Sequence, residues 1–553
     1  MLICCQIYYH NGLQYLHTMV MVKYSFFISG IIFRRGLSTS TSTIYALSTA
    51  PGRAALGVIR LSGPRSQRIL QRLTRFAKPS PPRTASLRRL YAPTVTTSSP
   101  ASEILDDALT LFFPAPNSYT GEDVVELHVH GGRAVINAVM DAVRAYGREP
   151  EDDNLARESG EVGAPVRYAD PGEFTRRAYA NFRMDLTEVE GVGGMIDAET
   201  EMQRVAAISA AGGYMRMLYN SWQAELLEIS ALMSAIIDFS EEGYFDTSGS
   251  LFHDSIANTS KLLSSIQKHS YQIERSEILL SGVKLALLGP PNAGKSSLLN
   301  LLARRDAAIV STTPGTTRDI VEIGLEIGGY KVVLTDTAGL RLASVVGDVE
   351  AQGIIRAKRA SADADVVIAV IPAVMEDPEW HQVVKDEILT LQEIGVDNIF
   401  DNYSLDPGPS PGKTIIVALN KTDMLQDPER ELPVLVSQIS KELNIIEDRI
   451  FPISCTEGEG VDKLMQKLVK SFEGLANLGS EAPIGASLRV QEIIRNDVVP
   501  SLQRFLEHAQ DDDVVFASEE IRYAAEAIGR ITGETIAVED VLGVVFSRFC
   551  VGK

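Results

Sequence analysis

Three patterns of apolar and polar residues divide the chain. Between residues 46 and 184, apolar residues alternate with polar ones in stretches such as "DALTLFF" and "EDVVELHVH", which predicts strands with one buried face. Turn-rich sequence such as "PAPNSYTGED" separates these stretches. From about residue 186 the apolar spacing becomes three and four residues, which is typical of helices. We therefore expect an α+β domain over residues 46–184, followed by a helical domain.

The helical pattern occurs in two blocks that lie far apart in the sequence. The first block carries an apolar stripe with alternating spacings of four and three residues. Its members are Trp222, Leu226, Ile229, Met233 and Ile236. The second block covers residues 488–509 and 517–534. Neither block is a long coiled coil, so we expect the two to pack on each other as one bundle.

Residues 280–475 are then a domain inserted into the helical one, with helical domain parts over residues 185–279 and 476–553. Short apolar runs alternate with helical stretches in this insertion, as in a doubly wound α/β sheet. The runs are "VKLALLG", "YKVVLTD", "ADVVIAVI", "TIIVALN" and "IFPIS". The expected fold class is therefore multidomain: an α+β domain, an α-helical bundle, and an inserted α/β domain.

Charge is distributed unevenly along the chain. The 553 residues carry a net charge of −20, with 45% hydrophobic and 22% charged residues, as in an ordinary globular protein. Residues 1–102 nevertheless hold 13 Lys and Arg and no Asp or Glu, since the first acid is Glu103. Because the body is acidic, any RNA must meet a local basic patch.

The first 45 residues have the composition of an organelle transit peptide: aromatic and aliphatic residues, Arg34, Arg35, a Ser/Thr run and no acid. A signal anchor and a wrongly assigned start codon are alternatives. Lys23 interrupts the apolar run, which is short for a membrane span, so we expect no stable membrane insertion. The chain has four cysteines, and two of them lie in this segment, so a disulfide framework is excluded and a reducing compartment is favoured.

A nucleotide site is predicted from residues 289–296, "GPPNAGKS", which fit a phosphate-binding loop between a strand and a helix. The glycines let backbone amides turn toward phosphates, Lys295 reaches the β and γ phosphates, and Ser296 ligates Mg²⁺. Asp336 ends a strand where a carboxylate that binds Mg²⁺ through a water belongs, and Thr317 can reach the metal.

Guanine recognition is predicted from "NKTD" (420–423) and "SCTEG" (454–458). The Asp423 carboxylate can accept from N1–H and the exocyclic amine of guanine, which adenine lacks. Four motifs in this order predict GTP binding. The expected GTP-contacting residues are Asn292, Ala293, Gly294, Lys295, Ser296, Ser297, Ser311, Thr312, Thr313, Pro314, Gly315, Thr316, Thr317, Asp336, Thr337, Ala338, Gly339, Asn420, Lys421, Thr422, Asp423, Ser454, Cys455 and Thr456.

These motifs, together with "PGRAALGVIRLSG", "DPGEFTRRAYANFRMDLTEVEG" and the ending "FCVGK", make the chain resemble the MnmE (TrmE) family of tRNA-modifying GTPases, in a mitochondrial version. The resemblance covers nearly everything after residue 46. It implies a folate-binding domain that forms a homodimer, and a helical domain interrupted by a GTPase domain. It also implies location in the mitochondrial matrix.

The resemblance further implies a reaction. Such proteins work with a flavoprotein of the GidA (MnmG) family, which carries FAD, and modify carbon 5 of the wobble uridine in mitochondrial tRNA. The one-carbon unit comes from 5-formyl- or methylene-tetrahydrofolate. Whether a glycine-derived or a taurine-derived group is finally installed, and in which tRNAs, does not follow from the sequence.

Many GTPases carry a glutamine after "DTAG" that orients the attacking water. In "DTAGLR" (336–341) Leu340 occupies this position, and its side chain cannot form a hydrogen bond with the water. The resemblance implies that K⁺ supplies positive charge and that Glu350 positions the water; alternatively, Glu350 only caps a helix. Pro314, a departure from the family, stiffens the potassium loop. The expected K⁺ ligands are Asn292, Ser311, Thr313 and Thr316, and the expected catalytic residues are Glu350, Lys295, Thr317 and Cys550.

On the folate side, the resemblance assigns Arg60, Glu126, Arg183 and Lys553 as binding residues. Arg183 replaces the family's usual lysine, which keeps the charge and changes the reach. The tail with Cys550 and Lys553 would deliver chemistry near the folate; a frayed terminus is the alternative. His128 and His130 share one strand face, and we interpret them as face residues rather than metal ligands.

Two rival functions share parts of this pattern. A regulatory GTPase of ribosome assembly would use the same nucleotide motifs, but such proteins usually append an RNA-binding module and lack folate determinants. A folate-binding scaffold with a decayed GTPase is disfavoured, because Lys295, Ser296, Thr317, Asp336 and Glu350 are all present.

Overall fold

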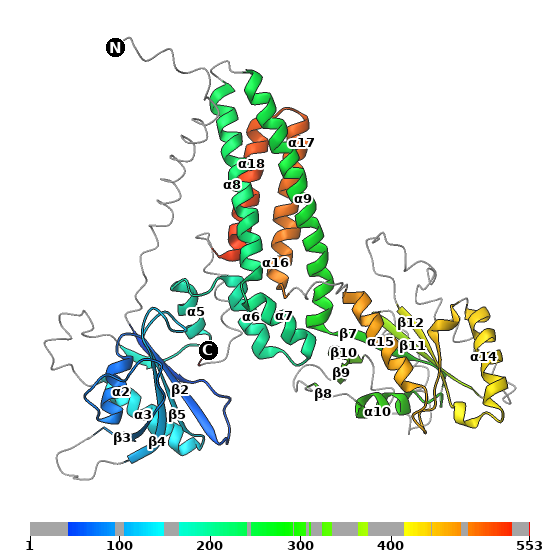
Figure 1. The fold of residues 1–553 in the computed structure, drawn as a ribbon, viewed down its shortest axis with the longest axis horizontal. Coiled ribbons are helices and arrows are strands. Elements are labelled where there is room, and N and C mark those ends of the chain that lie inside the picture. The colour runs from blue at the N-terminus through cyan, green and yellow to red at the C-terminus, as the bar shows by residue number, and fades with distance from the viewer. Residues whose placement is uncertain are drawn as a thin grey trace, which may run out of the picture. The chain divides into compact units, whose positions relative to one another are not determined.

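The computed structural model forms two compact units, Met1–Asp185 with Ala537–Lys553 and Leu186–Ile536 (Figure 1). The residues it describes are 42–93, 104–148, 165–240, 245–290, 292–305, 309–310, 323–334, 363–373, 414–443, 445–476, 485–533 and 552. Each unit has its own apolar core and is described separately below.

The first unit is a six-stranded sheet with helices, in the strand order β3-β4-β5-β2-β1-β6. Only the β1–β6 pair is parallel. Its elements are β1 (Thr43–Leu47), β2 (Leu56–Ser62), α2 (Ser66–Thr74), β3 (Ser86–Tyr91), β4 (Ile104–Phe113), β5 (Val124–His130), α3 (Arg133–Arg148), β6 (Val166–Tyr168) and α5 (Glu173–Ala180).

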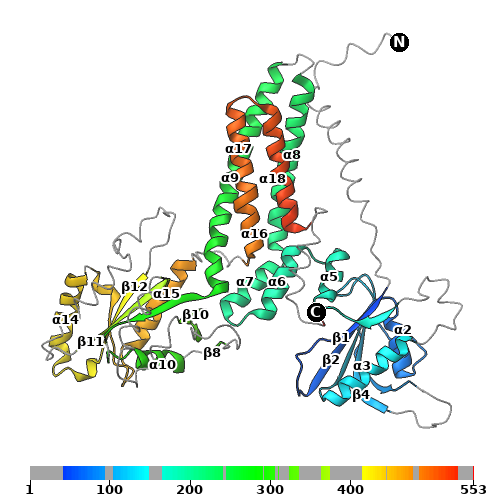
Figure 2. The same cartoon turned by 180° about the vertical axis from the view of Figure 1, so that it is seen from behind.

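Helices α2 and α3 cover one face of this sheet (Figure 2). The alternation seen in the sequence places Val125, Leu127 and Val129 of β5 in the core beneath these helices. The intervening side chains therefore lie on the opposite face. There α5 covers one end with Phe174, over Ala46 of β1.

The first strand begins earlier than the sequence analysis placed the folded part. Strand β1 starts at Thr43 rather than near residue 46, and it pairs with both β2 and β6. Ser42 is also held, because the Arg177 guanidinium donates to its carbonyl oxygen at 2.8 Å and to its Oγ at 2.9 Å. The folded part of the unit therefore includes residues 42–45, which the sequence analysis assigned to the transit peptide.

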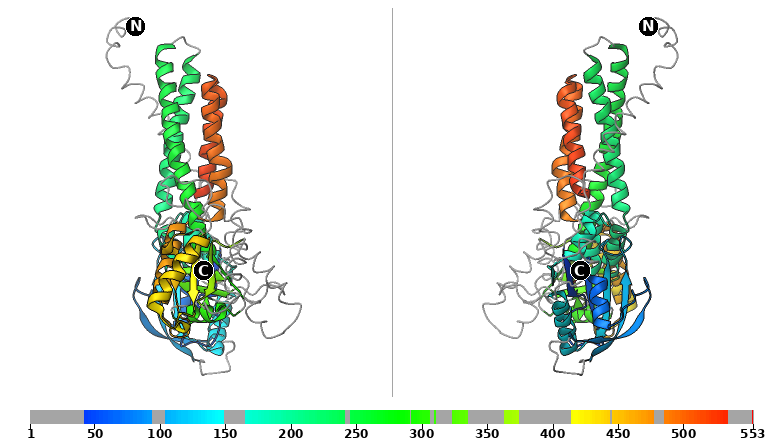
Figure 3. Two further views of the ribbon diagram at one scale, coloured as in Figure 1. Left: turned by 90° about the vertical axis from the view of Figure 1, so that its right-hand side faces the viewer. Right: turned by 90° about the vertical axis from the view of Figure 1, so that its left-hand side faces the viewer.

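In the second unit, long helices from both ends of the segment form one bundle (Figure 3). The bundle helices are α8 (Tyr214–Ser240), α9 (Phe245–Ser281), α16 (Leu488–Ile493), η3 (Ile494–Val498, a π-helical turn), α17 (Val499–Gln510) and α18 (Val514–Thr532), preceded by α6 (Leu186–Asp197) and α7 (Glu201–Ala211). The apolar stripe from Trp222 to Ile236 is buried against Ile494, Phe505 and Ile528. The predicted packing of the two helical blocks is confirmed.

The inserted domain contains a seven-stranded sheet in the order β13-β12-β11-β7-β10-β9-β8. Its elements are β7 (Val283–Leu288), α10 (Lys295–Arg305), β8 (Ile309–Val310), β9 (Ile323–Ile327), β10 (Tyr330–Leu334), β11 (Val366–Pro372), β12 (Thr414–Asn420), η1 (Thr422–Met424), α14 (Pro428–Leu443), η2 (Glu447–Arg449), β13 (Ile450–Pro452) and α15 (Val461–Ala476). All five strands predicted from the sequence are present. Strands β8 and β9 are additional and run antiparallel to their neighbours.

Parallel strands β11 and β12 are buried along almost their whole length, which explains their unbroken apolar runs. Side chains of β11 alternate between two cores, one on each face of the sheet. No helix among the described residues combines the length and apolarity that a membrane span needs.

A buried histidine makes the bundle's stability depend on pH. The Nε2 atom of His269 is 3.1 Å from the Tyr219 hydroxyl, and burial lowers the pKa of His269 to about 4. An unfolded histidine titrates near 6.5, so between about pH 6.5 and 4 the unfolded chain takes up a proton that the folded bundle excludes. The stability that the bundle gains from the neutral His269 is therefore complete above about pH 6.5 and is lost as the pH falls from about 6.5 to about 4.

We therefore expect His269→Phe to flatten the decline of bundle stability from pH 7 to pH 5. The measurement is the urea midpoint at each pH, followed by fluorescence of Trp222, whose ring lies 5.1 Å from that of His269, in a Trp380→Phe background. If the profiles of the variant and of the parent run parallel over this range, the assignment of the buried proton site is wrong.

Candidate functional site

The turn after β7 requires glycine at its first position. Gly289 has φ +144°, and a Cβ there would lie 2.3 Å from the carbonyl oxygen of Val370 on β11. The chain then runs into α10, which begins at Lys295. The loop thus brings backbone amides to a helix N-terminus, the geometry that binds phosphates.

A second close contact connects this loop to the end of β12. Asn420 is 2% exposed, and its Nδ2 donates to the Ala293 carbonyl oxygen at 2.8 Å. A Cβ on Gly294, which has φ +100°, would lie 2.0 Å from the same nitrogen. Asn292 also has positive φ, at 61°. The loop conformation and Asn420 therefore depend on each other.

The polar side chains of the loop lie at the start of α10. The Lys295 ammonium donates to the carbonyl oxygens of Gly289 at 2.6 Å and Pro290 at 2.8 Å. Ser296 and Ser297 occupy the first turn of α10 with exposed side chains. The donor set, one ammonium and a hydroxyl at the amino-terminal end of a helix, fits a phosphate with a divalent cation.

The base-recognition residues converge at the same edge of the sheet. The Ser454 hydroxyl donates to Asp423 Oδ1 at 2.7 Å, and the Cys455 amide donates to Asn420 Oδ1 at 3.2 Å. Lys421 has φ 68°, and Thr422 and Asp423 follow in a short 3-10 turn. One Asp423 oxygen is thus oriented by a hydroxyl, which suits a carboxylate that accepts from a base edge.

The thiol of Cys455 is held neutral. Burial, and the nearby negative charge of Asp423, raise the pKa of Cys455 to about 11. A thiol with such a pKa is a poor nucleophile at neutral pH. Cys455 thus donates its backbone amide to Asn420, and Thr456 follows it in the same turn.

A large part of the expected site lies outside the described residues. This part comprises Ser311, Thr312, Thr313, Pro314, Gly315, Thr316, Thr317, Asp336, Thr337, Ala338, Gly339, Leu340, Glu350, Cys550 and Lys553. The strands that border these segments are described. Strand β9 begins at Ile323, after the segment with Thr317, and β10 ends at Leu334, before the segment with Asp336.

The structure brings together the first two expected folate residues. Arg60 of β2 and Glu126 of β5 are register partners, and the guanidinium contacts Glu126 Oε1 through Nε at 3.0 Å and through a terminal nitrogen at 2.8 Å. Both side chains are about one-fifth exposed, at 21% and 18%. The second carboxylate oxygen of Glu126 lies 3.6 Å from His128 Nε2. Both hydrogen bonds from Arg60 thus go to the same oxygen, Oε1.

Aromatic residues that the sequence analysis did not single out surround this pair. The Arg60 guanidinium lies 5.3 Å from the ring centre of Tyr119 and 5.9 Å from that of Phe174. Arg183 contacts the same loop, because its Nε donates to the Ser118 carbonyl oxygen at 3.1 Å. The signal in the sequence was the turn-rich "PNSYTGED", whose tyrosine is its one aromatic residue.

The end of the chain returns to this sheet. The Ser48 hydroxyl donates to the Gly552 carbonyl oxygen at 2.8 Å, and Gly552 has φ +98° with a Cβ position 2.3 Å from the Leu47 carbonyl oxygen. Residues 537–553 accordingly belong to the first unit, although the sequence analysis grouped them with the helical domain. Gly552 thus lies beside the end of β1. Ala46 of β1 is the register partner of Arg60 on β2.

The two histidines of β5 have separate partners. His130 Nδ1 is 2.7 Å from Asp106 of β4, whereas His128 faces Glu126.

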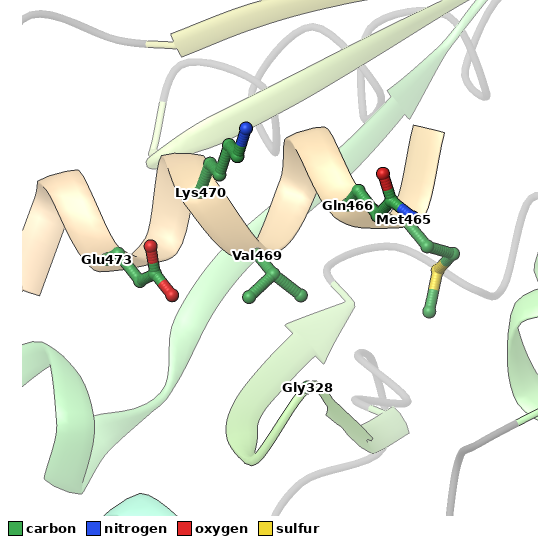
Figure 4. Close-up of a pocket in the computed structure, with 6 residues that line it drawn as sticks. All are labelled: Gly328, Met465, Gln466, Val469, Lys470 and Glu473. Carbon is green, nitrogen blue, oxygen red and sulfur yellow. The ribbon is translucent and has the colours of Figure 1, made fainter. Parts of the chain in front are cut away.

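In the second unit, a hollow of about 380 Å³ lies between the β9–β10 turn at Gly328 and one side of α15 (Figure 4). Met465, Val469 and Glu473 line it, and none of the expected nucleotide or folate residues does.

Comparisons with known proteins cover almost the whole chain. It is 37% identical over 528 residues to the mitochondrial tRNA modification GTPase MSS1 of Saccharomyces cerevisiae, spanning 92% of this chain and 93% of the relative. It is 40% identical over 514 residues to the tRNA modification GTPase MnmE of Parvibaculum lavamentivorans, spanning 92% and 100%. The mitochondrial tRNA modification GTPase gtpbp3 of Dictyostelium discoideum is 35% identical over 525 residues, spanning 94% and 96%.

Family models match both structural units. Residues 43–183 match the model described as the GTP-binding protein TrmE N-terminus, and residues 186–550 match the MnmE helical domain. The first match begins at the residue where β1 begins. The resemblance inferred from the motifs is therefore confirmed, and the chain belongs to the MnmE (TrmE) family.

Proposed function

We propose that this chain is a GTPase that acts in the modification of mitochondrial tRNA. The observation that carries the proposal is the joined nucleotide pocket, in which Asn420 ties the phosphate loop to the guanine-recognition turn and Ser454 orients Asp423. The relatives named above are tRNA modification GTPases, two of them mitochondrial, and support the process and the location.

The finer reaction is modification of carbon 5 of the wobble uridine, with a GidA/MnmG-type flavoprotein that carries FAD. A tetrahydrofolate derivative would supply the one-carbon unit to the first unit of the structure. The Arg60–Glu126 pair beside Tyr119 and Phe174 supports a flat ligand with ring N–H donors, because Arg60 donates to only one of the two Glu126 oxygens and the other could accept from such a ring. Arg183 and the tail at Gly552 border the same sheet region.

A homodimer through the first unit is supported by exposed leucines on one face of its sheet. Leu56, Leu87 and Leu109 lie on the face opposite α2 and α3, and Leu87 is 75% exposed. A patch of exposed leucines on a regular sheet is a common feature of interfaces. The same face carries Arg60 and Glu126.

Cation binding is assigned to residues of the nucleotide site. Ser296 at the start of α10 would hold Mg²⁺ with Thr317, and Asn292 would hold K⁺ with Ser311, Thr313 and Thr316. Bound there, K⁺ supplies positive charge beside the γ-phosphate, where charge develops in the transition state.

The experiment that tests the proposed function is nucleoside analysis of mitochondrial tRNA after deletion of the gene. We expect the wobble uridines to lose their carbon 5 modification. Mitochondrial ribosome assembly should be unchanged in the same cells. That result separates this function from the function of a ribosome-assembly GTPase. Unchanged wobble uridines would refute the proposal.

GTP turnover should depend on potassium, because Asn292 stands in the phosphate loop and K⁺ replaces the charge of an arginine finger. We expect turnover to be roughly tenfold or more faster in KCl than in NaCl of equal concentration. Asn292→Ala should remove most of this difference. Equal rates in both salts, or a variant that keeps full potassium stimulation, would contradict the assignment.

Glu350→Ala should separate hydrolysis from binding. We expect GTP affinity to stay within about threefold while turnover falls roughly 10²-fold, the scale for loss of a group that positions a water. Leu340→Ala is the matched control, because its side chain cannot hold the water. If the control loses hydrolysis and Glu350→Ala keeps it, the roles are assigned to the wrong residue.

The mature chain should begin between Arg35 and Ser42. The sequence composition allows a start as late as Ala50, but strand β1 and the Ser42 contacts with Arg177 belong to the folded unit. Amino-terminal sequencing of the protein from isolated mitochondria measures this directly. A first residue beyond Ser42 would mean that β1 is removed, and an intact Met1 would argue against import by a cleaved presequence.

A further inference from the structure

One edge of the first unit gathers basic residues in an otherwise acidic chain. Residues 46–102 contain ten Arg and Lys and no Asp or Glu, whereas the whole chain has a net charge of −20. Four of these bases come from the stretch between the end of α2 and the edge strand β3. We call them the basic edge: Arg75, Lys78, Arg83 and Arg88.

Aromatic rings hold two of these guanidinium groups. Arg75 caps α2 in a left-handed conformation, and its guanidinium lies 4.4 Å from the ring centre of Tyr91. Arg88 of β3 lies 4.2 Å from the ring centre of Phe76, which is itself 46% exposed. Stacking fixes the plane of a guanidinium while leaving edge N–H groups to donate to acceptors such as phosphate oxygens.

The basic edge lacks neutralising carboxylates in the part of the chain that the structure describes. There, no ion pair involves Arg75, Lys78, Arg83 or Arg88; the guanidinium of Arg83 donates to the Asn117 carbonyl oxygen, at 2.7 Å. The neighbouring Arg89 differs, because it is paired with Asp107 at 2.9 Å.

Other exposed arginines of the chain are commonly paired, as the helical bundle illustrates. Arg504 contacts Glu520 at 2.9 Å, and Arg530 contacts Asp497 at 2.6 Å. Cations along one edge that have no carboxylate partner among the described residues leave a positive potential there. A polyanionic partner can neutralise it.

We propose that the basic edge binds the phosphate backbone of the tRNA substrate, an inference that rests on the proposed function. The acidic body repels RNA, so contact with the chain requires a local positive surface. Guanidinium planes beside an exposed aromatic ring suit RNA, where phosphates accept hydrogen bonds and unstacked bases pack on rings. An anionic membrane or an acidic protein would need the charges but not the exposed ring of Phe76.

The test compares two double variants of the full mature chain that each remove one arginine and one lysine. Arg75→Gln with Lys78→Gln removes charge from the basic edge. Arg430→Gln with Lys441→Gln is the matched control on α14 of the inserted domain, where Arg430 is 88% exposed. Binding to an unmodified mitochondrial tRNA transcript is measured by fluorescence anisotropy from 50 to 300 mM KCl.

We expect the basic-edge variant to bind the transcript about tenfold or more weakly at 100 mM KCl. The slope of log affinity against log salt should become shallower by about 1.5, as for the loss of two phosphate contacts. The control should bind like the parent chain, and GTP turnover of both variants should be unchanged, which shows that the inserted domain is intact.

Equal affinities of the two variants would overturn the proposal. So would a basic-edge variant that keeps tRNA affinity but loses binding to vesicles of phosphatidylcholine with 30% phosphatidylserine, since the surface would then belong to a membrane. Nucleoside analysis of the gene deletion decides the proposed function independently. Loss of the wobble modification together with equal affinities would reject only the basic edge.

Discussion

Burial of one apolar core between two distant helical segments is the interaction on which the second unit depends. Helices α8 and α9 pack against α17 and α18, with Trp222, Leu226 and Phe505 inside. This contact closes the chain around the whole inserted domain. Helix α9 then passes into β7 through Gly282 alone, which has φ +91° and sits against Lys331 and Val333. The nucleotide-binding sheet is therefore attached to the bundle by a short junction. Truncating one buried bundle residue would lower the free energy of unfolding of the bundle by about 2–5 kcal/mol.

A second connection links the sheet to the helical part of the unit. The Met202 amide of α7 donates to the Gly329 carbonyl oxygen at 3.1 Å, and Lys331 pairs with Glu199 at 2.9 Å. Gly329 lies in the turn between β9 and β10, the strands that adjoin the expected potassium loop and the segment with Asp336. The far ends of these strands thus contact helix α7. A shift of either strand during a nucleotide cycle would have to be accommodated at this contact.

Charge separates the two kinds of chemistry in this protein. In the nucleotide pocket, backbone amides and Lys295 are expected to bind the phosphates and the Asp423 carboxylate to accept from the base, and close packing at Gly289 and Gly294 fixes the loop. On the first unit, the basic edge presents cations on aromatic rings at the surface. The first arrangement favours one geometry, whereas the second tolerates the variable path of a nucleic-acid backbone.

The sequence by itself determined the strands of the inserted domain, the two halves of the bundle and the phosphate loop with its guanine motifs, because periodicity and turn chemistry act over a few neighbouring residues. Only the tertiary structure decided contacts between segments far apart in the chain. Examples are the pairing of Arg60 with Glu126, the return of Gly552 to β1, and the inclusion of Thr43 in the first sheet. Such contacts are fixed by sheet register and by the packing of whole elements, which no local pattern encodes.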